Sequence, residues 1–172
     1  MKPEGLAAPE RTLAAAAQAP EIAALLAQRG ETVSVAETAA GGLISAALVA
    51  VPGASAWFLG GAVAYGELAK ARWLGLEAES FAPDGVVSAR GAMALARAVR
   101  DSLGATWGLA EVGIAGPQTG RRSRKGAGLA YVAVCGPQEV WREVFTGEGQ
   151  RVTNQGAFAL AALRLLRETL AR

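Results

Sequence analysis

Short apolar runs alternate with helix-like segments along most of this 172-residue chain, and this alternation limits its possible folds more than any other feature. Residues 32–36 (TVSVA), 108–117 (GLAEVGIAGP) and 129–136 (LAYVAVCG) have the composition of buried strands. Residues 21–30 (EIAALLAQRG) instead predict a helix that ends with Gly30 as its C-cap. The alternation predicts an α/β or α+β fold, in which a mixed β-sheet lies between two layers of helices in a three-layer sandwich.

The remaining segments complete this pattern. Ser88 precedes apolar residues at helical spacing and can cap the helix that they form. Residues 139–146 (EVWREVFT) follow the preceding strand after a connection of three residues, which favours an antiparallel hairpin. We also expect a short helical turn at 55–59, a strand at 62–66, and helices at 41–51, 67–75 and from Ala157 to about Leu170.

Length and composition favour one domain. A chain of this length with 52% hydrophobic residues can bury a single core. Residues 1–20 are rich in alanine and contain three prolines, so we expect a loosely ordered lead-in with room for one short helix, followed by a single domain over 21–172. Residues 41–65 are uncharged, but Pro52 and Gly53 interrupt them, so we expect no membrane span. Because the N-terminus does not resemble a secretion signal, we expect a cytoplasmic protein.

Histidine is absent and Cys135 is the single cysteine, which excludes several kinds of site. An intrachain disulfide, a cysteine-rich metal cluster, a histidine-ligated zinc and a Ser-His-Asp arrangement are all impossible. Catalysis would have to use a lysine, a tyrosine, a carboxylate or a hydroxyl, and we expect neither a metal nor another cofactor. Residues 121–125 (RRSRK) carry four positive charges, but a short basic loop without aromatic residues is typical of a solvated surface, so we do not expect a nucleic-acid partner.

Residues 34–42 (SVAETAAGG) lead from the end of a strand into the glycine-rich start of a helix. In many enzymes such a junction carries a nucleophile, and the candidate hydroxyl here belongs to Thr38. This hydroxyl is either a nucleophile or the N-cap of the following helix. The backbone amides of Gly41 and Gly42 suit a phosphate or an oxyanion. Residues 113–117 (GIAGP) form a second glycine-containing loop at a strand end, where α/β folds usually bind ligands.

Four segments in this order resemble the C-terminal domain of the CinA family, the nicotinamide-nucleotide amidohydrolases. They are VAETAAGG (35–42), VPGASAWFLGGAVAYGELAK (51–70), VGIAGP (112–117) and GLAYVAV (128–134). The resemblance covers roughly residues 21–170. It implies the family's fold and an activity that hydrolyses the carboxamide of nicotinamide mononucleotide to nicotinic acid mononucleotide and ammonia.

The resemblance also implies roles for individual residues. Thr38 is at the position of the family's nucleophilic serine, Tyr65 at that of a nearby tyrosine, and Lys70 at that of the lysine that activates the serine. A lysine serves as a base only if burial or a neighbouring cation lowers its pKa from about 10.4 toward neutrality, and a solvent-facing lysine is the alternative for Lys70. The apolar helices favour a homo-oligomer. Contacts to a small nucleotide-like ligand are expected from Glu37, Gly41, Gly42, Gly113, Ala115 and Gly116.

This chain departs from the family pattern around the expected site. Ala39 and Ala40 replace a cysteine and a threonine, and Val112 replaces a second threonine. Glu111 adds a carboxylate where the family is usually apolar, and it is either a pocket acid or a charged strand end. The extra methyl group of Thr38 restricts its χ1 angle and crowds the path of attack. The sequence therefore leaves two hypotheses, a weak amidohydrolase and a catalytically inactive member that binds a nucleotide-like ligand or a protein partner.

Overall fold

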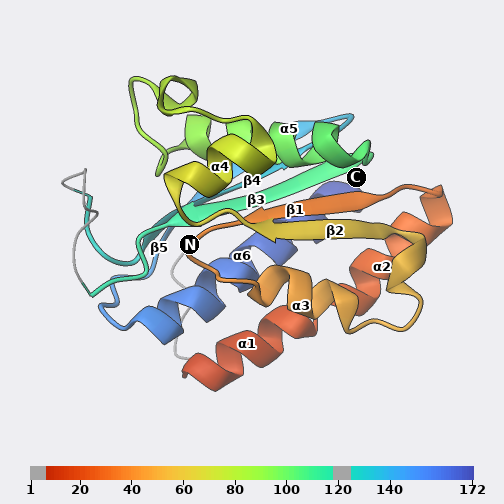
Figure 1. Cartoon of the computed structure of the whole chain (residues 1–172). Helices are drawn as coiled ribbons and strands as arrows, with labels where there is room; N and C mark the ends of the chain where they lie inside the picture. Colours follow the sequence, from red (N-terminus) through yellow and green to blue (C-terminus); the bar gives the residue numbers. More distant parts are fainter. Residues whose placement is uncertain (1–6, 118–124) are drawn as a thin grey trace.

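A five-stranded mixed sheet forms the middle layer of the molecule (Figure 1). The structure is a computed structural model, and it describes residues 7–117 and 125–172. The strand order is β2-β1-β3-β4-β5, with β1 parallel to both of its neighbours and β4 antiparallel to both of its own. The strands are β1 (Val33–Glu37), β2 (Phe58–Val63), β3 (Trp107–Gly113), β4 (Leu129–Cys135) and β5 (Glu139–Phe145).

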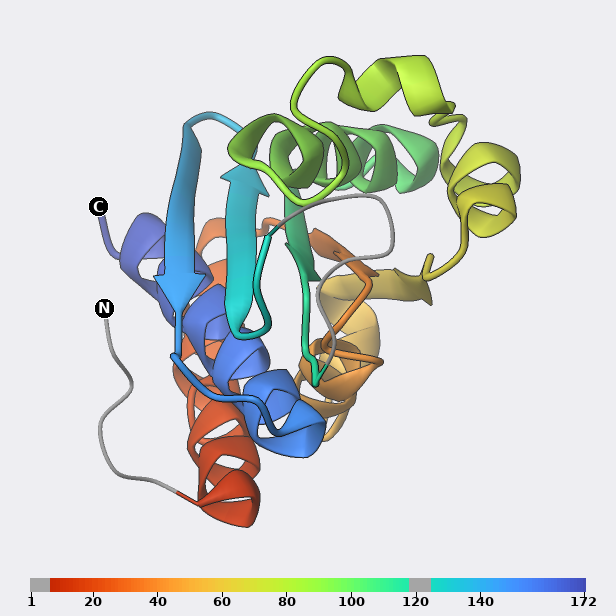
Figure 2. The same ribbon diagram turned by 90° about the vertical axis from the view of Figure 1, so that its left-hand side faces the viewer.

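Helices cover both faces of this sheet, as the sequence predicts. Helices α1, α2, α3 and α6 lie on one face, and α4 and α5 lie on the other (Figures 1 and 2). Within the described part of the chain, no helix combines the length and the apolar character that a membrane crossing requires. The helices are α1 (Ala8–Ala16), α2 (Ala19–Arg29), α3 (Leu43–Val49), α4 (Glu67–Leu74), α5 (Ala89–Leu103) and α6 (Arg151–Leu170), with short 3₁₀ helices η1 (Ala54–Ala56) and η2 (Ala78–Phe81).

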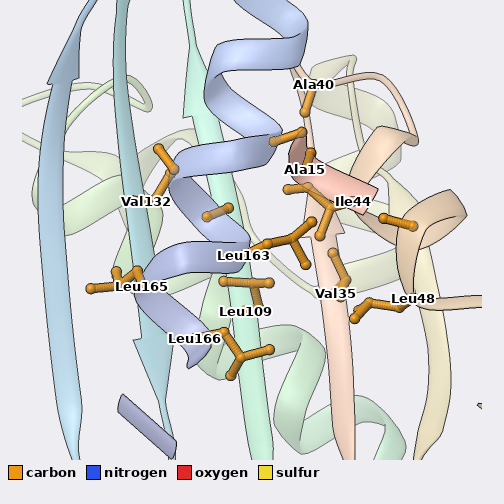
Figure 3. Packing of buried hydrophobic residues seen from close by; sticks show 14 of the residues in the cluster. Ala15, Val35, Ala40, Ile44, Leu48, Leu109, Val132, Leu163, Leu165 and Leu166 are labelled. Carbon is orange, nitrogen blue, oxygen red and sulfur yellow. The ribbon is translucent and has the colours of Figure 1, made fainter. Parts of the chain in front are cut away.

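The larger part of the core lies between α6 and the sheet. Alternate residues of each strand point to this face, so that Val35 of β1 and Leu109 of β3 are buried there. Figure 3 shows Leu163 and Leu166 of α6 packed over these strands. On the opposite face, the strands present small residues to α5, including Ala110. Helix α5 approaches the sheet closely here, since a Cβ atom at Gly108 would overlap the Ala96 carbonyl, and this close approach favours small residues.

Helix α5 begins where the sequence predicts. The hydroxyl of Ser88 accepts a hydrogen bond of 3.0 Å from the Gly91 amide and so caps the helix. The β4–β5 hairpin also agrees with the prediction, with Val134 paired to Val140 in antiparallel register.

Strand β2 lies four residues before the predicted strand at 62–66, because it includes Gly60 and Gly61. A Cβ atom at Gly61 would overlap Ser45 of α3, so a glycine is required where the helix crosses the strand. The glycine pair therefore reflects close packing and not a loop. As a result, Tyr65 lies beyond the end of β2, in the connection to α4.

Helix α6 begins at Arg151, six residues before the predicted start at Ala157. Its first turns are mostly polar and contain Gly156, so the sequence of this segment resembles that of a loop. Gly156 instead lies against α1, where an added Cβ would be 3.0 Å from the Cβ of Arg11. Helix α1 falls within the expected lead-in, and its Ala15 is part of the main core.

Candidate functional site

Glu37 ends β1 and holds the start of helix α3. Its Oε2 atom accepts hydrogen bonds from the amides of Gly42 (2.9 Å) and Ile44 (3.0 Å). Its Oε1 atom accepts from the amide and the hydroxyl of Ser45 at 2.8 and 2.7 Å. The side chain is fully buried, and the amides at the helix start stabilise its negative charge. Glu37, and not Thr38, is therefore the residue that caps α3.

These contacts correct two expectations. The N-cap interpretation of Thr38 is wrong, because its hydroxyl donates to and accepts from no other described residue. The expectation of a free amide at Gly42 is also wrong, because this amide donates to Glu37. Both glycines do adopt the left-handed backbone that favours glycine, with φ of 69° at Gly41 and 101° at Gly42.

Thr38 follows directly after Glu37 and is buried, with 5% of its surface exposed. Its Oγ1 atom is among the few buried side-chain atoms of the described residues that have no hydrogen-bond partner. Leaving a buried hydroxyl unsatisfied costs about 1–3 kcal/mol. The hydroxyl of Thr38 is thus available for chemistry or for a ligand and is not used to stabilise the fold.

Glu111 lies on β3 beside Glu37. Ala36 of β1 pairs with Ala110 of β3, so the two glutamates follow this pair on adjacent parallel strands. The Oε2 atom of Glu111 accepts hydrogen bonds from the amides of Thr38 (3.1 Å) and Ala40 (2.8 Å). Its Oε1 atom is buried without a partner among the described residues. Of the two interpretations of Glu111, the structure therefore supports a buried acid and excludes a solvent-exposed strand end.

The environment of Glu111 keeps its proton near neutral pH. Burial raises the pKa of Glu111 to about 7, although the hydrogen bonds from the Ala40 and Thr38 amides lower it. The neighbouring charge of Glu37 adds to the increase. A carboxyl group with a pKa near 7 can exchange its proton at the pH of most cells. The sequence shows Glu111 as a departure from the family pattern, but it does not predict which backbone amides contact its carboxyl group.

Lys70 lies on α4 and is buried, with 5% of its surface exposed, so it is not a solvent-facing lysine. Its Nζ atom donates a hydrogen bond of 2.7 Å to the backbone carbonyl of Tyr65. Burial lowers the pKa of Lys70, and the charges of Glu67 and Glu111 act in the opposite direction. The charge of Lys70 is therefore close enough to Glu111 to affect the same site.

Tyr65 contributes its backbone to this arrangement, because its side chain is 61% exposed. Glu37 pairs with Val63 across β1 and β2, so Tyr65 follows at the same edge of the sheet. No hydrogen bond joins the hydroxyl of Thr38 to Lys70 in the structure. The predicted nucleophile and base thus lie at the same edge of the sheet without a hydrogen bond between them.

The predicted loop after β3 is held by helix α6. Asn154 of α6 is fully buried and donates hydrogen bonds to the carbonyls of Ala115 (2.8 Å) and Glu148 (2.9 Å). A Cβ atom at Gly113 would lie 2.7 Å from the Cβ of Ala130, and one at Gly116 would lie 2.8 Å from the Gly149 carbonyl. Close packing therefore explains the glycines at positions 113 and 116, and Ala115 contributes its backbone carbonyl to the contact with α6.

Among the described residues, no group of three or more acidic, histidine or cysteine side chains could hold a metal ion.

Most of the basic segment at 121–125 lies outside the described residues. Its last residue, Lys125, donates to the carbonyls of Asp84 (3.2 Å) and Val87.

Comparison with known proteins shows the family of this chain. Residues 15–170 match the model of the CinA C-terminal domain. The chain is 44% identical over 151 residues to a CinA-like protein from Anaeromyxobacter sp. (strain K), and 42% identical over 147 residues to one from Frankia casuarinae. These matches cover 87% and 86% of this chain but 36% and 34% of the relatives, so the chain spans about a third of their length.

Solved structures agree with these relatives. The competence/damage inducible protein CihA from Agrobacterium tumefaciens is 30% identical with a TM-score of 0.84, and the match covers 92% of this chain and 96% of that one. The competence damage-inducible protein A (ComA) from Klebsiella pneumoniae is 28% identical with a TM-score of 0.85, over 92% and 98% of the two chains. The resemblance seen in the sequence is confirmed, and the chain belongs to the family of CinA C-terminal domains.

Proposed function

We propose that this domain hydrolyses the carboxamide of a nicotinamide nucleotide to a carboxylate and ammonia, slowly, with Thr38 as the nucleophile and Lys70 as its base. The observation that carries this proposal is the hydroxyl of Thr38, which is buried at the end of β1 without a partner among the described residues. The buried Lys70, with its lowered pKa, supports it. The identity of the substrate, nicotinamide mononucleotide, comes from the family resemblance.

The proposed reaction has two steps. The neutral amine of Lys70 accepts the proton of the Thr38 hydroxyl while Oγ1 attacks the amide carbon of the substrate. The carbon–nitrogen bond then breaks as the amide nitrogen takes this proton from the Lys70 ammonium and leaves as ammonia, and an ester links the substrate to Thr38. Water hydrolyses this ester, which releases the carboxylate and restores the hydroxyl. Burial favours the neutral form of Lys70 on which the first step depends.

One observation favours a second candidate, a member of the family that binds a ligand without turnover. Lys70 Nζ donates to the Tyr65 carbonyl, and no hydrogen bond connects it to Thr38. Nζ must therefore come within hydrogen-bond distance of Thr38 Oγ1 before it can accept the proton. A misplacement of about 1 Å at a catalytic group can cost a hundredfold in rate.

Ammonia release from nicotinamide mononucleotide tests the proposal. We expect slow release by the wild-type chain, faster release by Thr38→Ser because serine lacks the extra methyl group, and none by Thr38→Ala. Lys70→Met should also abolish release. Thr12→Ser is the matched control, because Thr12 lies on α1, outside the proposed site, and its hydroxyl donates to the Ala8 carbonyl.

The outcomes separate the two candidates. No release by either the wild type or Thr38→Ser would refute the hydrolase. Thermal stabilisation of the same samples by the nucleotide, without release, would then identify a binding protein. Release that persists in Thr38→Ala would show that another residue is the nucleophile.

A further inference from the structure

The amides of the backbone turn after β1 are occupied by a carboxyl group of the chain itself. The amides of Thr38 and Ala40 both donate to one oxygen of Glu111, at 3.1 and 2.8 Å. The Ala39 amide between them also favours the charged form of this carboxyl group. Successive amides that converge on one oxygen are the arrangement by which proteins bind oxyanions.

Two buried atoms indicate that this turn is built for more than the fold. The hydroxyl of Thr38 and the second carboxylate oxygen of Glu111 are both buried, and neither has a hydrogen-bond partner among the described residues. Buried polar groups usually have a partner, and two exceptions on residues that contact each other point to a ligand. The two residues contact each other, because the Thr38 amide donates a hydrogen bond to Glu111.

The charged form of Glu111 is only weakly stabilised in this position. The side chain is fully buried, and burial opposes its charge more strongly than the amides support it. The charged groups that act on it are Glu37 on β1, which opposes its charge, and Lys70 on α4, which supports it. An incoming anion would thus compete with an occupant that readily becomes neutral.

We propose that the amides of residues 38–40 form a binding site for the oxyanion group of a ligand, a carboxylate or a phosphate, and that Glu111 occupies this site in the structure. A ligand must displace Glu111 to reach the amides and the hydroxyl of Thr38. Glu111 is therefore an internal competitor whose replacement opens the site. This inference goes beyond the proposed hydrolysis, because it concerns binding and does not require turnover.

Titration with inorganic phosphate and, separately, with acetate tests the site. Binding is followed by the amide resonances of Thr38 and Ala40 in ¹⁵N-labelled protein, which report on the turn whether or not the protein is an enzyme. Glu111→Val removes the competing carboxylate, and a β-branched residue suits a strand. Glu111→Gln is the matched control, because it keeps an oxygen that accepts from the amides.

We expect Glu111→Val to bind at least one of the two anions more tightly than Glu111→Gln by about tenfold, which is the effect of about 1.4 kcal/mol. The anion that binds distinguishes a carboxylate from a phosphate ligand. Equal binding by the two variants, or amide shifts absent from a folded Glu111→Val, would overturn the proposal.

The wild-type chain provides the measurement if Glu111→Val does not fold. Its affinity for acetate, and for sulfate in place of phosphate, should be higher at about pH 5.5, where Glu111 is neutral, than at about pH 8.5, where Glu111 competes as a carboxylate. These two anions keep nearly the same charge at both pH values. An affinity that is equal at both pH values would then reject the proposal. Ammonia release plays no part in these results, so a failed hydrolase and a failed anion site remain distinguishable.

Discussion

Replacement of Glu111 by glutamine should remove a large part of the pH dependence of this protein's stability. The pKa of Glu111 is about 7 in the folded chain, against 4.5 for an ordinary glutamate. Between these values the folded chain holds a proton that the unfolded chain has lost. The free energy of unfolding therefore falls as pH rises, because the folded state binds more protons than the unfolded state.

The size of this effect follows from the same two values. One unit of pKa corresponds to about 1.4 kcal/mol, so the increase predicts a loss of about 3 kcal/mol between about pH 4.5 and pH 7. The contribution is fully present below pH 4.5 and is lost as pH rises through about 7. Such a loss is a substantial fraction of the 5–15 kcal/mol that is typical of a whole domain.

Urea denaturation measures this effect. Unfolding free energies of the wild type and Glu111→Gln are compared at about pH 5 and about pH 8, with Glu79→Gln as a control because Glu79 is exposed. Glutamine keeps the shape and an acceptor oxygen but cannot ionise, so its advantage over the wild type should grow by about 3 kcal/mol as pH rises. Other ionisable groups affect both proteins equally. A constant difference between wild type and Glu111→Gln across this range would refute the reasoning.

Three further substitutions test the packing that supports the site. Glu37→Ala removes the acceptor of four hydrogen bonds at the start of α3 and should lower the free energy of unfolding by at least about 3 kcal/mol, measured by urea denaturation. Gly108→Ala would place a Cβ atom against the Ala96 carbonyl, so it should either prevent folding or cost about 3 kcal/mol, as read from circular dichroism during heating. Ser88→Ala removes the cap of α5 and should cost about 1 kcal/mol by the same method, and a loss of less than about 0.3 kcal/mol would contradict its role.

The sequence was sufficient to predict the three layers of the fold. It also predicts those boundaries of helices and of the hairpin that depend on neighbouring residues. Gly30 adopts the left-handed conformation of a C-cap, and Ser88 caps α5, because both effects depend on a few neighbouring residues. Apolar alternation likewise predicts which strands are buried. These features could be read directly because their physical cause is local in the chain.

Boundaries that depend on contacts between distant segments could not be predicted in this way. Gly61 is required by Ser45 of α3, and Gly156 packs tightly against Arg11 of α1. In each case a glycine that locally suggests a break is instead part of a regular element that packs closely. The role of Glu111 could not be predicted for the same reason, because it depends on amides that are more than seventy residues away in the chain.

The two buried glutamates explain how the turn could lose polar side chains and keep its shape. The backbone of residues 38–45 is fixed by side chains of residues outside this segment. Glu37 accepts hydrogen bonds from amides at the helix start, and Glu111 accepts from the amides of Thr38 and Ala40. Gln155 of α6 adds a hydrogen bond of 3.0 Å to the Ala39 carbonyl. None of these contacts uses a side chain of residues 38–40, so alanine at two of these positions leaves the supporting bonds intact.

This backbone support has a consequence for the test of function. Because the hydroxyl of Thr38 holds no part of the turn, Thr38→Ser and Thr38→Ala should change the free energy of unfolding by less than about 1 kcal/mol. Urea denaturation of both variants measures this. If stability is unchanged while ammonia release rises in Thr38→Ser and vanishes in Thr38→Ala, the difference reports the chemistry of one hydroxyl. A large loss of stability in Thr38→Ala that Thr38→Ser does not share would instead show that the hydroxyl supports the turn, which would remove the argument that it is free to react.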